Sequence, residues 1–285
     1  MTLRETFSMV LRRYLRVPYT LNTYEFASPK KPKATVVLVH GIGNSLHAWD
    51  EVVARLPNDI RVIGVDLLGF GGSPKPAWAK YSASTQARAL GLTLASLRLT
   101  QQPIIVGHSL GALVAIETAR RYGLLIKQLL LCNPPFYRPE SEAKTGVLNQ
   151  ERILRELYRV ARKHPEQLQS LSPMAVKLGL ANKALNITGD NVSAYVAALE
   201  ASIINQTSLR DVRRLQLSIR ILYGAFDPVV IKKHIVRLGK DRKNVTVRRV
   251  LAGHEITGSY VKVVAEEIAA AGQVEQGPRA SVRPA

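Results

Sequence analysis

Short apolar runs recur along the chain between longer stretches in which apolar and polar residues mix. Six of these runs are rich in Val, Ile and Leu and end next to turn-forming or polar residues. Continuous apolar runs of this length are typical of parallel strands that are buried on both faces of a sheet. The predicted strands are Thr35–His40, Arg61–Asp66, Pro103–His108, Gln128–Cys132, Ile219–Gly224 and Val245–Val250.

The stretches between these runs have helical spacing of their apolar residues. Ser84–Leu99 and Leu110–Tyr122 each lie between two predicted strands, and Tyr260–Ala271 is predicted as the last helix. A chain that alternates strands and helices forms a mostly parallel sheet with helices packed on both of its faces. The pattern therefore predicts an α/β fold.

One long stretch, from Phe136 to Ser208, interrupts this alternation because it contains no strand pattern. Pro134 and Pro135 precede it, and prolines cannot donate to a strand ladder. Two helical stripes of apolar residues predict a helical cap over the sheet, whose inner face walls an acyl or alkyl pocket. The stripes are Ile153, Leu154, Leu157, Val160 and Ala161, and Val192, Val196, Leu199 and Ile203.

The pattern thus predicts one α/β core with an insertion and two terminal additions. The core comprises residues 34–135 and 209–272, and the helical cap occupies residues 136–208. Residues 1–33 are predicted as a basic N-terminal arm with a short helix. Residues 273–285, rich in Gly, Pro, Ser and Ala, are predicted as a flexible tail.

The N-terminal arm combines helical spacing of apolar residues with several arginines. It lacks the uninterrupted apolar region of about 7–15 residues that a secretory signal requires. Arg12 and Arg13 resemble a twin-arginine signal, but residues 17–22 are too polar for that role. We expect a short basic helix that docks on the domain, with contact to an anionic membrane surface as the alternative.

Charge is distributed unevenly along the chain. Forty Lys and Arg residues against 21 Asp and Glu give a net charge of +19. Residues 210–249 carry twelve basic and three acidic side chains, and residues 1–33 carry seven basic and two acidic ones. We interpret the excess as a solvated basic surface, with anionic lipid or an acidic substrate as the alternative. No nucleic-acid motif accompanies the charge, so no nucleic-acid partner is predicted.

The remaining composition excludes several classes of protein. Hydrophobic residues make up 46% of the chain, which is enough for a sizeable core. No apolar run reaches the roughly 18 residues of a membrane span. The single cysteine, Cys132, excludes an internal disulfide framework and fits a reducing, cytoplasmic compartment. We expect it to be a small buried hydrophobe.

The main chemical signal is Gly107-His108-Ser109-Leu110-Gly111, between a predicted strand and a predicted helix. This is the setting of a nucleophile elbow, a tight turn that holds a serine hydroxyl out at the carboxyl end of the sheet. Glycines on both sides of the serine remove side-chain bulk from the turn. The alternative interpretation is an ordinary serine N-cap of the helix.

A serine hydroxyl needs a base, and the base needs an orienting acid. Asp227 and His254 each follow a predicted strand and come after Ser109 in the order Ser, acid, His. Since parallel strands end at one edge of the sheet, we expect these three side chains to meet there. Asp211 is the weaker alternative for the acid, and we expect Glu255 beside the histidine to be incidental.

An oxyanion hole requires two backbone N–H donors. Leu110 directly follows the nucleophile, and Ile42 lies in the loop after the first predicted strand, between Gly41 and Gly43. We therefore predict the N–H groups of Ile42 and Leu110 as the donors. A phosphate-binding loop is the alternative for this segment, but it lacks a third glycine and a Walker lysine.

Four residues near these motifs are candidates for the substrate pocket, namely Gly41, His47, Trp49 and His108. His108 is also expected to pack against or orient the elbow. The six histidines show no metal-ligand spacing, so neither a metal nor a cofactor is predicted. Asp66 and the glycines that follow it are expected to shape a turn rather than to take part in chemistry.

Taken together, four motifs in this order resemble the α/β-hydrolase family. They are His40–Gly43, Asp66–Ser73, Gly107–Gly111 and the pair Asp227 and His254. The resemblance covers about residues 34–135 and 210–272. It implies an eight-stranded, mostly parallel sheet with a helical lid inserted after the sixth strand. Serine at the nucleophile position differs from the aspartate of epoxide hydrolases and haloalkane dehalogenases.

These observations predict a serine hydrolase, carboxylesterase-like, that cleaves small to medium acyl esters through an acyl-enzyme. The nearest alternative is a carbon–carbon bond hydrolase of the meta-cleavage-product type, and lactonase, amidase, thioesterase and perhydrolase activities share the same triad. A membrane-surface enzyme acting on lipid esters and a non-enzymatic binding module are the alternatives from other classes. The sequence leaves the natural substrate and the oligomeric state open.

Overall fold

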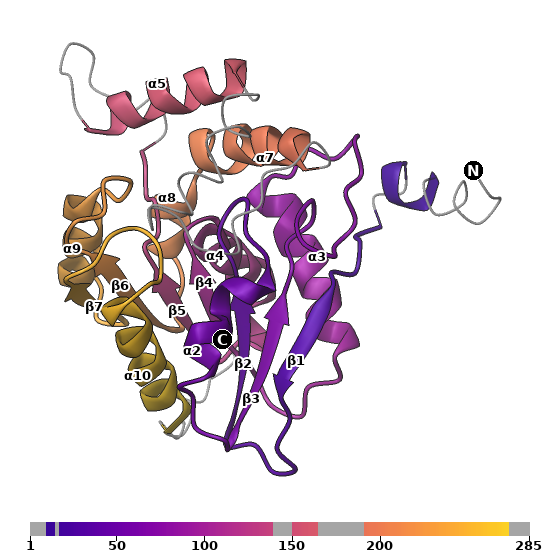
Figure 1. Ribbon diagram of the computed structural model, residues 1–285, viewed down its shortest axis with the longest axis vertical. Helices are drawn as coiled ribbons and strands as arrows, with labels where there is room; N and C mark the ends of the chain where they lie inside the picture. Colours follow the sequence, from indigo (N-terminus) through magenta and orange to yellow (C-terminus); the bar gives the residue numbers. More distant parts are fainter. Residues whose placement is uncertain (1–9, 15–16, 139–149, 165–190, 274–285) are drawn as a thin grey trace, which may run out of the picture.

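The computed structural model of the protein describes residues 10–14, 17–138, 150–164 and 191–273. A seven-stranded sheet with the order β1-β3-β2-β4-β5-β6-β7 runs through the described part (Figure 1). Strand β1 is antiparallel to β3, and every other neighbouring pair is parallel. The strands are β1 (Thr23–Ala27), β2 (Ala34–Val39), β3 (Ile60–Val65), β4 (Ile104–His108), β5 (Gln128–Cys132), β6 (Ser218–Gly224) and β7 (Val245–Val250).

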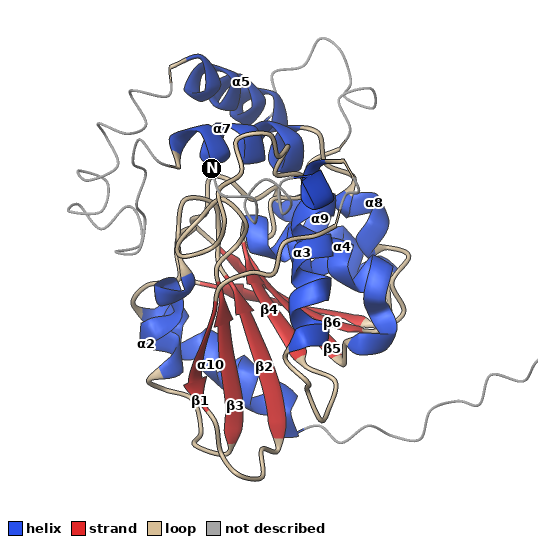
Figure 2. Cartoon of the chain, turned by 90° about the vertical axis from the view of Figure 1, so that its right-hand side faces the viewer, coloured by secondary structure: helices blue, strands red, loops and turns tan. Residues whose placement is uncertain are grey.

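Helices cover both faces of this sheet. Figure 2 shows α3 and α4 on one side of the strands and α2 and α10 on the other. Their apolar faces bury two separate clusters, which is the layered arrangement expected of an α/β fold. The helical elements are η1 (Leu46–Trp49), α2 (Asp50–Val53), α3 (Ala83–Ser96), α4 (Leu110–Tyr122), η2 (Gly123–Leu125), α5 (Gln150–Lys163), α7 (Val192–Ala198), η4 (Leu199–Ile204), α8 (Ser208–Val212), α9 (Lys232–Asp241) and α10 (Ser259–Gln273).

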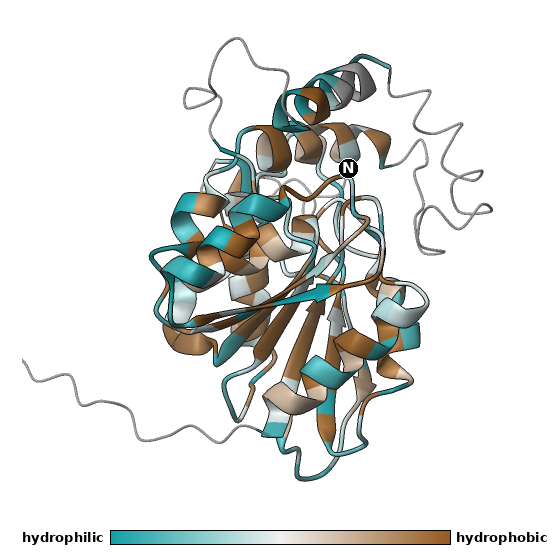
Figure 3. Cartoon of the chain, turned by 90° about the vertical axis from the view of Figure 1, so that its left-hand side faces the viewer, coloured by the Kyte–Doolittle hydropathy of each residue, from teal (hydrophilic) through white to brown (hydrophobic). Residues whose placement is uncertain are grey.

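The predicted α/β fold is confirmed, and the continuous apolar runs have a simple cause. In β2, Val37 and Val39 face the cluster under α4, whereas Val36 and Leu38 face the cluster under α10. Successive side chains of a strand point to opposite faces, so a strand covered on both faces must be apolar throughout. Figure 3 shows the apolar colour along the inner strands, whereas the strand nearest the viewer also carries polar residues.

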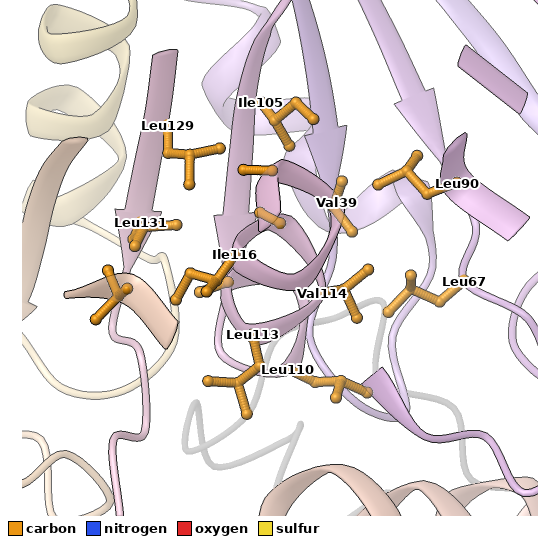
Figure 4. Packing of buried hydrophobic residues seen from close by; sticks show 14 of the residues in the cluster. Val39, Leu67, Leu90, Ile105, Leu110, Leu113, Val114, Ile116, Leu129 and Leu131 are labelled. Atoms are coloured by element: carbon orange, nitrogen blue, oxygen red, sulfur yellow. The ribbon is translucent and has the colours of Figure 1, made fainter. Parts of the chain in front are cut away.

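Helix α4 is the central packing element on its face of the sheet. Figure 4 shows its residues Leu113 and Ile116 lying among side chains of the strands, including Ile105 and Leu131. All four side chains are at most 1% exposed. Burying such side chains stabilises the fold by about 1.5–3 kcal/mol each. This packing fixes the helix whose first turn carries the nucleophile candidate.

The expectation of eight strands is wrong for the described residues, which form seven. Strand β1 also lies inside residues 1–33, which were predicted as an arm. Residues 10–13, which precede β1 in the chain, form a short helix and add no further strand to the edge of the sheet. Pro18, which follows this helix, accepts a hydrogen bond from Arg12 at 2.6 Å and has no N–H to donate to a neighbouring strand.

The short N-terminal helix lies against the domain. The Arg12 guanidinium stacks on the Tyr19 ring at 4.1 Å, and the Tyr19 ring lies 6.0 Å from that of Trp78. The expectation that this helix docks on the domain instead of a membrane surface stays a prediction. No helix within the described ranges is both long enough and apolar enough to cross a bilayer.

Helices α5 and α7 lie above the carboxyl ends of the strands, where a cap was predicted (Figure 1). Of the predicted α5 stripe, Leu154 is buried but Ile153 is 49% exposed. The side chains of Leu157, Val160 and Ala161 lie outside the described residues, as does the predicted tail beyond Gln273. Leu199, which belongs to the second predicted stripe, is the first residue of η4, a π-helical turn that continues α7.

Candidate active site

The turn between β4 and α4 has the strained geometry of a nucleophile elbow. Ser109 has φ +51° and ψ −116°, a conformation that non-glycine residues rarely adopt. A Cβ atom on Gly107 would lie 2.4 Å from the carbonyl oxygen of Gly111, and one on Gly111 would lie 2.2 Å from that of Val39. Gly107 therefore allows the first turn of α4 to approach β4, and Gly111 allows it to approach the end of β2.

The ordinary N-cap alternative for Ser109 does not fit this geometry. An N-cap serine accepts a hydrogen bond from the first turn of its helix, and the Ser109 side chain makes none. Its hydroxyl instead lies 3.0 Å from Nε2 of His254. The Ser109 backbone N–H donates to the Cys132 carbonyl at 3.0 Å, which ties the turn to the end of β5.

The structure brings Ser109, Asp227 and His254 together at the carboxyl edge of the sheet. His254 follows β7, and its Nδ1 lies 2.7 Å from Oδ2 of Asp227, which follows β6 and is 1% exposed. The alternative acid, Asp211, lies in α8 and hydrogen-bonds to Thr207 at 2.5 Å. The residues are thus in a chain of hydrogen bonds from carboxylate to imidazole to hydroxyl.

Backbone groups hold the Asp227 carboxylate in a fixed orientation. Its Oδ1 accepts from the N–H groups of Val229 at 2.7 Å and Val230 at 3.2 Å. The other oxygen is left to accept from Nδ1–H of His254, so Nε2 of the neutral ring is an acceptor toward Ser109. This is the tautomer that a general base requires.

The environment also favours the protonated form of His254. Burial by itself lowers its pKa, but the hydrogen bond to Asp227 and the negative charges of Asp227 and Glu255 outweigh burial and raise that pKa above its usual value. An imidazolium at this position is therefore stabilised by nearby carboxylates.

Asn133, which the sequence analysis missed, ties the loops of the candidate triad together. Its Oδ1 accepts from the Gly224 N–H at 2.8 Å, and its Nδ2 donates to the carbonyl oxygens of Gly253 at 3.1 Å and His254 at 2.5 Å. It is fully buried, with φ +49°. Its place directly after β5, at the same sheet edge, is the signal that could have identified it.

Two buried histidines support the loops around Ser109. His108 Nε2 lies 2.9 Å from the His254 carbonyl and donates to it, and burial lowers the pKa of His108. His40 bridges Gly41 O at 2.7 Å and the Leu67 N–H at 2.9 Å, and burial lowers the pKa of His40 as well. Both imidazole rings are therefore neutral, and their hydrogen bonds hold the neighbouring loops in place.

Asp66 organises a turn beside the site, as its motif indicated. Its Oδ1 accepts from the Leu46 N–H at 2.7 Å, and its Oδ2 accepts from the Gly72 N–H at 2.8 Å. A Cβ on Gly71, which has φ +51°, would lie 2.2 Å from the Asp66 carboxyl carbon. The aspartate thus shapes the loop and does not face the cavity.

The predicted oxyanion donors lie where the loop after β2 passes the nucleophile. A Cβ on Gly41 would lie 3.3 Å from Cβ of Ser109, so this loop packs directly against the elbow. Ile42 lines the cavity at Ser109. Leu110 is the first residue of α4, so its N–H has no acceptor within the helix. The assignment of both N–H groups to an oxyanion hole stays a prediction.

The described residues around Ser109 enclose a cavity of about 190 Å³. The loops at the sheet edge form one side, and Tyr158 of α5, Tyr195 of α7 and two residues of η4 form the other. None of the described lining residues is Lys or Arg. The lining residues are Gly41, Ile42, Asn44, His108, Ser109, Pro135, Tyr158, Tyr195, Leu199, Ile203, Val229, His254 and Glu255.

Two of the four pocket candidates are brought to the cavity, and two are not. Gly41 and His108 line it. The side chain of His47 is 64% exposed and lies 3.3 Å from Asp50, and Trp49 is buried in the cluster under α10. The short helix η1 turns both side chains away from Ser109, so the prediction for His47 and Trp49 is wrong.

One group of side chains in the described residues has the composition of a metal site. Ligand atoms of His108, His254 and Glu255 lie within 4.8 Å of one another. Both nitrogens of His254 are already engaged with Asp227 and Ser109, and His108 Nε2 donates to a carbonyl. The group therefore offers few free donors, and the expectation of no metal remains a prediction.

This arrangement of fold and site matches a known family. The model of the alpha/beta hydrolase fold family matches residues 34–257, which include the elbow and both partners of Ser109. The chain therefore belongs to this family. The matched residues also include 136–208, the segment that was predicted as a cap inserted between two strands of the sheet.

Individual relatives are more distant. A probable lysophospholipase of Arabidopsis thaliana, BODYGUARD 4, is 31% identical over 124 residues, 43% of this chain and 29% of that protein. The chain thus spans less than a third of that relative's length. A bromoperoxidase from Bacillus anthracis has a TM-score of 0.73 at 21% identity, covering 88% of this chain and 94% of that one. An esterase from Exiguobacterium antarcticum has a TM-score of 0.72 at 17% identity, covering 89% and 96%.

Proposed function

We propose that this protein is a serine hydrolase that cleaves small to medium acyl esters through an acyl-enzyme. The observation that carries the proposal is the chain of hydrogen bonds from Asp227 to His254 to Ser109, at 2.7 and 3.0 Å. Membership of the alpha/beta hydrolase fold family agrees with hydrolysis but leaves the bond type open.

In the first half of the reaction, Ser109 Oγ attacks the ester carbonyl carbon while Nε2 of His254 takes the hydroxyl proton. The Asp227 carboxylate stabilises the imidazolium that forms. The negative charge on the carbonyl oxygen is received by the N–H groups of Ile42 and Leu110. Collapse of the tetrahedral intermediate breaks the bond to the alcohol, which leaves with the proton from His254.

In the second half, a water molecule replaces the alcohol. Nε2 of His254 takes a proton from the water as its oxygen attacks the acyl carbon. The intermediate collapses, the carboxylic acid is released and Ser109 regains its proton. His108 and Asn133 act as positioning residues, because each holds the His254 carbonyl from one side.

The cavity supports esters over the carbon–carbon bond alternative. The meta-cleavage-product hydrolases bind a substrate carboxylate, which requires a positive group near the nucleophile. The described lining residues contain no Lys or Arg, and they contain one carboxylate, Glu255. A cavity of about 190 Å³ is below the usual range of about 300–1,000 Å³ for ligand pockets, which favours short acyl chains.

The test is hydrolysis of 4-nitrophenyl esters from acetyl to palmitoyl by the purified protein, with Ser109→Ala in parallel. We expect activity on short chains and a loss of at least about 10³-fold in kcat/KM in the variant. Intact-mass analysis after treatment with a phosphonate ester should show one adduct, on the wild type alone.

Two outcomes would change the proposal. Undiminished ester hydrolysis by a folded Ser109→Ala protein would exclude the mechanism. Labelling of Ser109 by the phosphonate without turnover of any ester would retain the nucleophile and favour carbon–carbon or another specialised hydrolysis.

A second candidate is hydrolysis of lipid esters at an anionic surface, which the name of the plant relatives favours. A groove beside the N-terminal helix is lined by Arg12, Arg13, Lys80 and Arg88 around the Trp78 ring. The basic α9 and β7 region lies on the other side of the molecule from the N-terminal helix in Figure 1, so the two basic regions are separate surfaces. Co-sedimentation with anionic vesicles at low salt tests this; no binding would exclude it.

A further inference from the structure

We propose that the cavity at Ser109 selects esters that carry a quaternary ammonium group a few atoms from the scissile carbonyl, and disfavours esters that carry a carboxylate there. The selecting residue is Glu255. This inference rests on the proposed ester hydrolysis and specifies its substrate class.

Glu255 places a carboxylate in the cavity, and none of the described lining residues is a Lys or Arg that could pair with it. It is half-buried and lines the cavity, and its carboxylate lies within 4.8 Å of ring nitrogens of His108 and His254. Within the described part of the chain, the Glu255 side chain makes no ion pair and no hydrogen bond. Of the two histidines, His108 is held neutral by burial, which lowers its pKa, and His254 is already paired with Asp227 at 2.7 Å. A cationic substrate group can therefore supply the missing counter-charge.

Asn44 provides a second group with negative partial charge. Asn44 lines the cavity and is 3% exposed, and its buried Oδ1 has no hydrogen-bond partner among the described residues. Buried polar atoms are nearly always paired, so the unpaired oxygen of this lining residue requires positive charge density nearby to satisfy it. The polarised C–H groups of an alkylammonium meet this requirement; a carboxylate oxygen does not.

Two aromatic rings complete the arrangement. Tyr158 and Tyr195 line the cavity from the cap side. The Tyr137 hydroxyl donates to the Val229 carbonyl at 2.8 Å, so in the 3.2 Å contact between the Tyr137 and Tyr158 hydroxyls, Tyr158 is the donor. The Tyr158 proton is thus directed away from the cavity. A carboxylate beside aromatic rings is the combination that binds quaternary ammonium groups.

The overall charge of +19 has the opposite sign to this cavity. At physiological ionic strength, exposed charges are screened beyond about 8 Å, whereas groups in contact inside a cavity are screened much less. Preference in the catalytic step therefore follows Glu255, while the basic surface acts on the approach of substrate at low salt.

The test uses three 4-nitrophenyl esters of matched size. They are the cationic 4-(trimethylammonio)butanoate, its neutral isostere 5,5-dimethylhexanoate, and the anionic glutarate monoester. For the wild type in 0.15 M salt we expect kcat/KM for the cationic ester to exceed that for the isostere by about tenfold or more, and the glutarate ester to be the slowest. In Glu255→Gln the ratio of cationic to neutral kcat/KM should fall to about one.

A matched control separates local from overall charge. Glu51→Gln removes one exposed carboxylate from α2, away from the cavity, and should leave the ratio unchanged. A wild-type ratio at or below one would overturn the proposal, as would an unchanged ratio in a folded Glu255→Gln protein. The wild-type ratio needs no variant, so misfolding of Glu255→Gln leaves the test intact.

Failure of the proposed function would look different. In that case none of the three esters is cleaved in a Ser109-dependent way. The same ratio is then measured as the rates at which matched cationic and neutral phosphonates label Ser109. Faster cationic labelling would support the selectivity without ester turnover; equal or slower cationic labelling would overturn it.

Discussion

The sheet edge and the helical cap build the two sides of one cavity by different means. On the sheet side, backbone groups fix each polar side chain; Asp227, for example, accepts from two N–H groups, and Asn133 bridges two loops. On the cap side, Tyr195 and Leu199 contribute rings and apolar surface from α7 and η4. Under the proposed function, the sheet edge supplies the reacting groups and the charge of Glu255, and the cap sets the size of the acyl group that fits.

The largest effect should come from breaking the sheet side at its acid. Asp227→Asn keeps the shape but removes the charge and permits the wrong tautomer of His254, so we expect kcat to fall by about 10³–10⁴-fold. The measurement is kcat on a short 4-nitrophenyl ester at fixed pH. Asp59→Asn, which removes an exposed partner of Lys33, is the matched control and should stay within about twofold.

A retained kcat in Asp227→Asn would assign the acid to another residue. The candidate would then be Glu255, since its charge also acts on His254.

The second-largest effect should come from a change to Asn133, which holds the loops of the sheet side in place and does not line the cavity. Asn133→Asp tolerates the positive φ but loses the amide donors to the Gly253 and His254 carbonyls. We expect kcat to fall by about 10–100-fold through misplacement of the base, with KM nearly unchanged. Stopped-flow measurement of the acylation step checks this, and an effect confined to KM would contradict a positioning role.

A smaller effect is expected on the cap side. Ile203→Ala enlarges the cavity from η4, where Ile203 is 3% exposed. We expect the ratio of kcat/KM for octanoyl to butanoyl esters to rise by about tenfold, while kcat for the preferred ester changes by less than about threefold. Val212→Ala, at a fully buried position of α8 outside the cavity, is the control for lost stability. An equal change in the octanoyl-to-butanoyl ratio in both variants would refute the assignment of acyl-chain size selection to the cap side.

The smallest effect concerns pH. His254 accepts the Ser109 proton only when neutral, so kcat/KM falls as pH drops through its pKa. Burial opposes protonation, but Asp227 and Glu255 raise this pKa above its usual value, while His108, 5.1 Å away ring to ring, is kept neutral by a lowered pKa. Removing one carboxylate in Glu255→Gln lowers the pKa of His254, so the acid limb should move to lower pH.

The pH–rate profile of kcat/KM on a neutral ester measures this shift. An acid limb that stays in place, or moves to higher pH, would show that the Glu255 charge does not act on the base. Glu51→Gln should leave the limb where it is.

The sequence identified the sheet-side residues because their positions follow from local pattern. Ser109, Asp227 and His254 each come directly after an apolar run, and parallel strands bring such positions to one edge. It missed β1, because the short TYEFA segment lies partly exposed at the edge of the sheet and is not one of the continuous apolar runs from which the strands were predicted. It also assigned Glu255 no role, since a residue beside a motif carries no signal of which way it points.

By itself, then, the sequence determined the α/β fold, the order of the strands along the chain and the residues that meet at the carboxyl edge. These depend on hydrophobic periodicity and on turns, which act over a few residues. Only the tertiary structure decided that η1 turns His47 and Trp49 away, and that Asn44, Tyr158 and Tyr195 line the cavity with Glu255. Those contacts join segments far apart in the chain, and they are fixed by packing between elements, which no local pattern encodes.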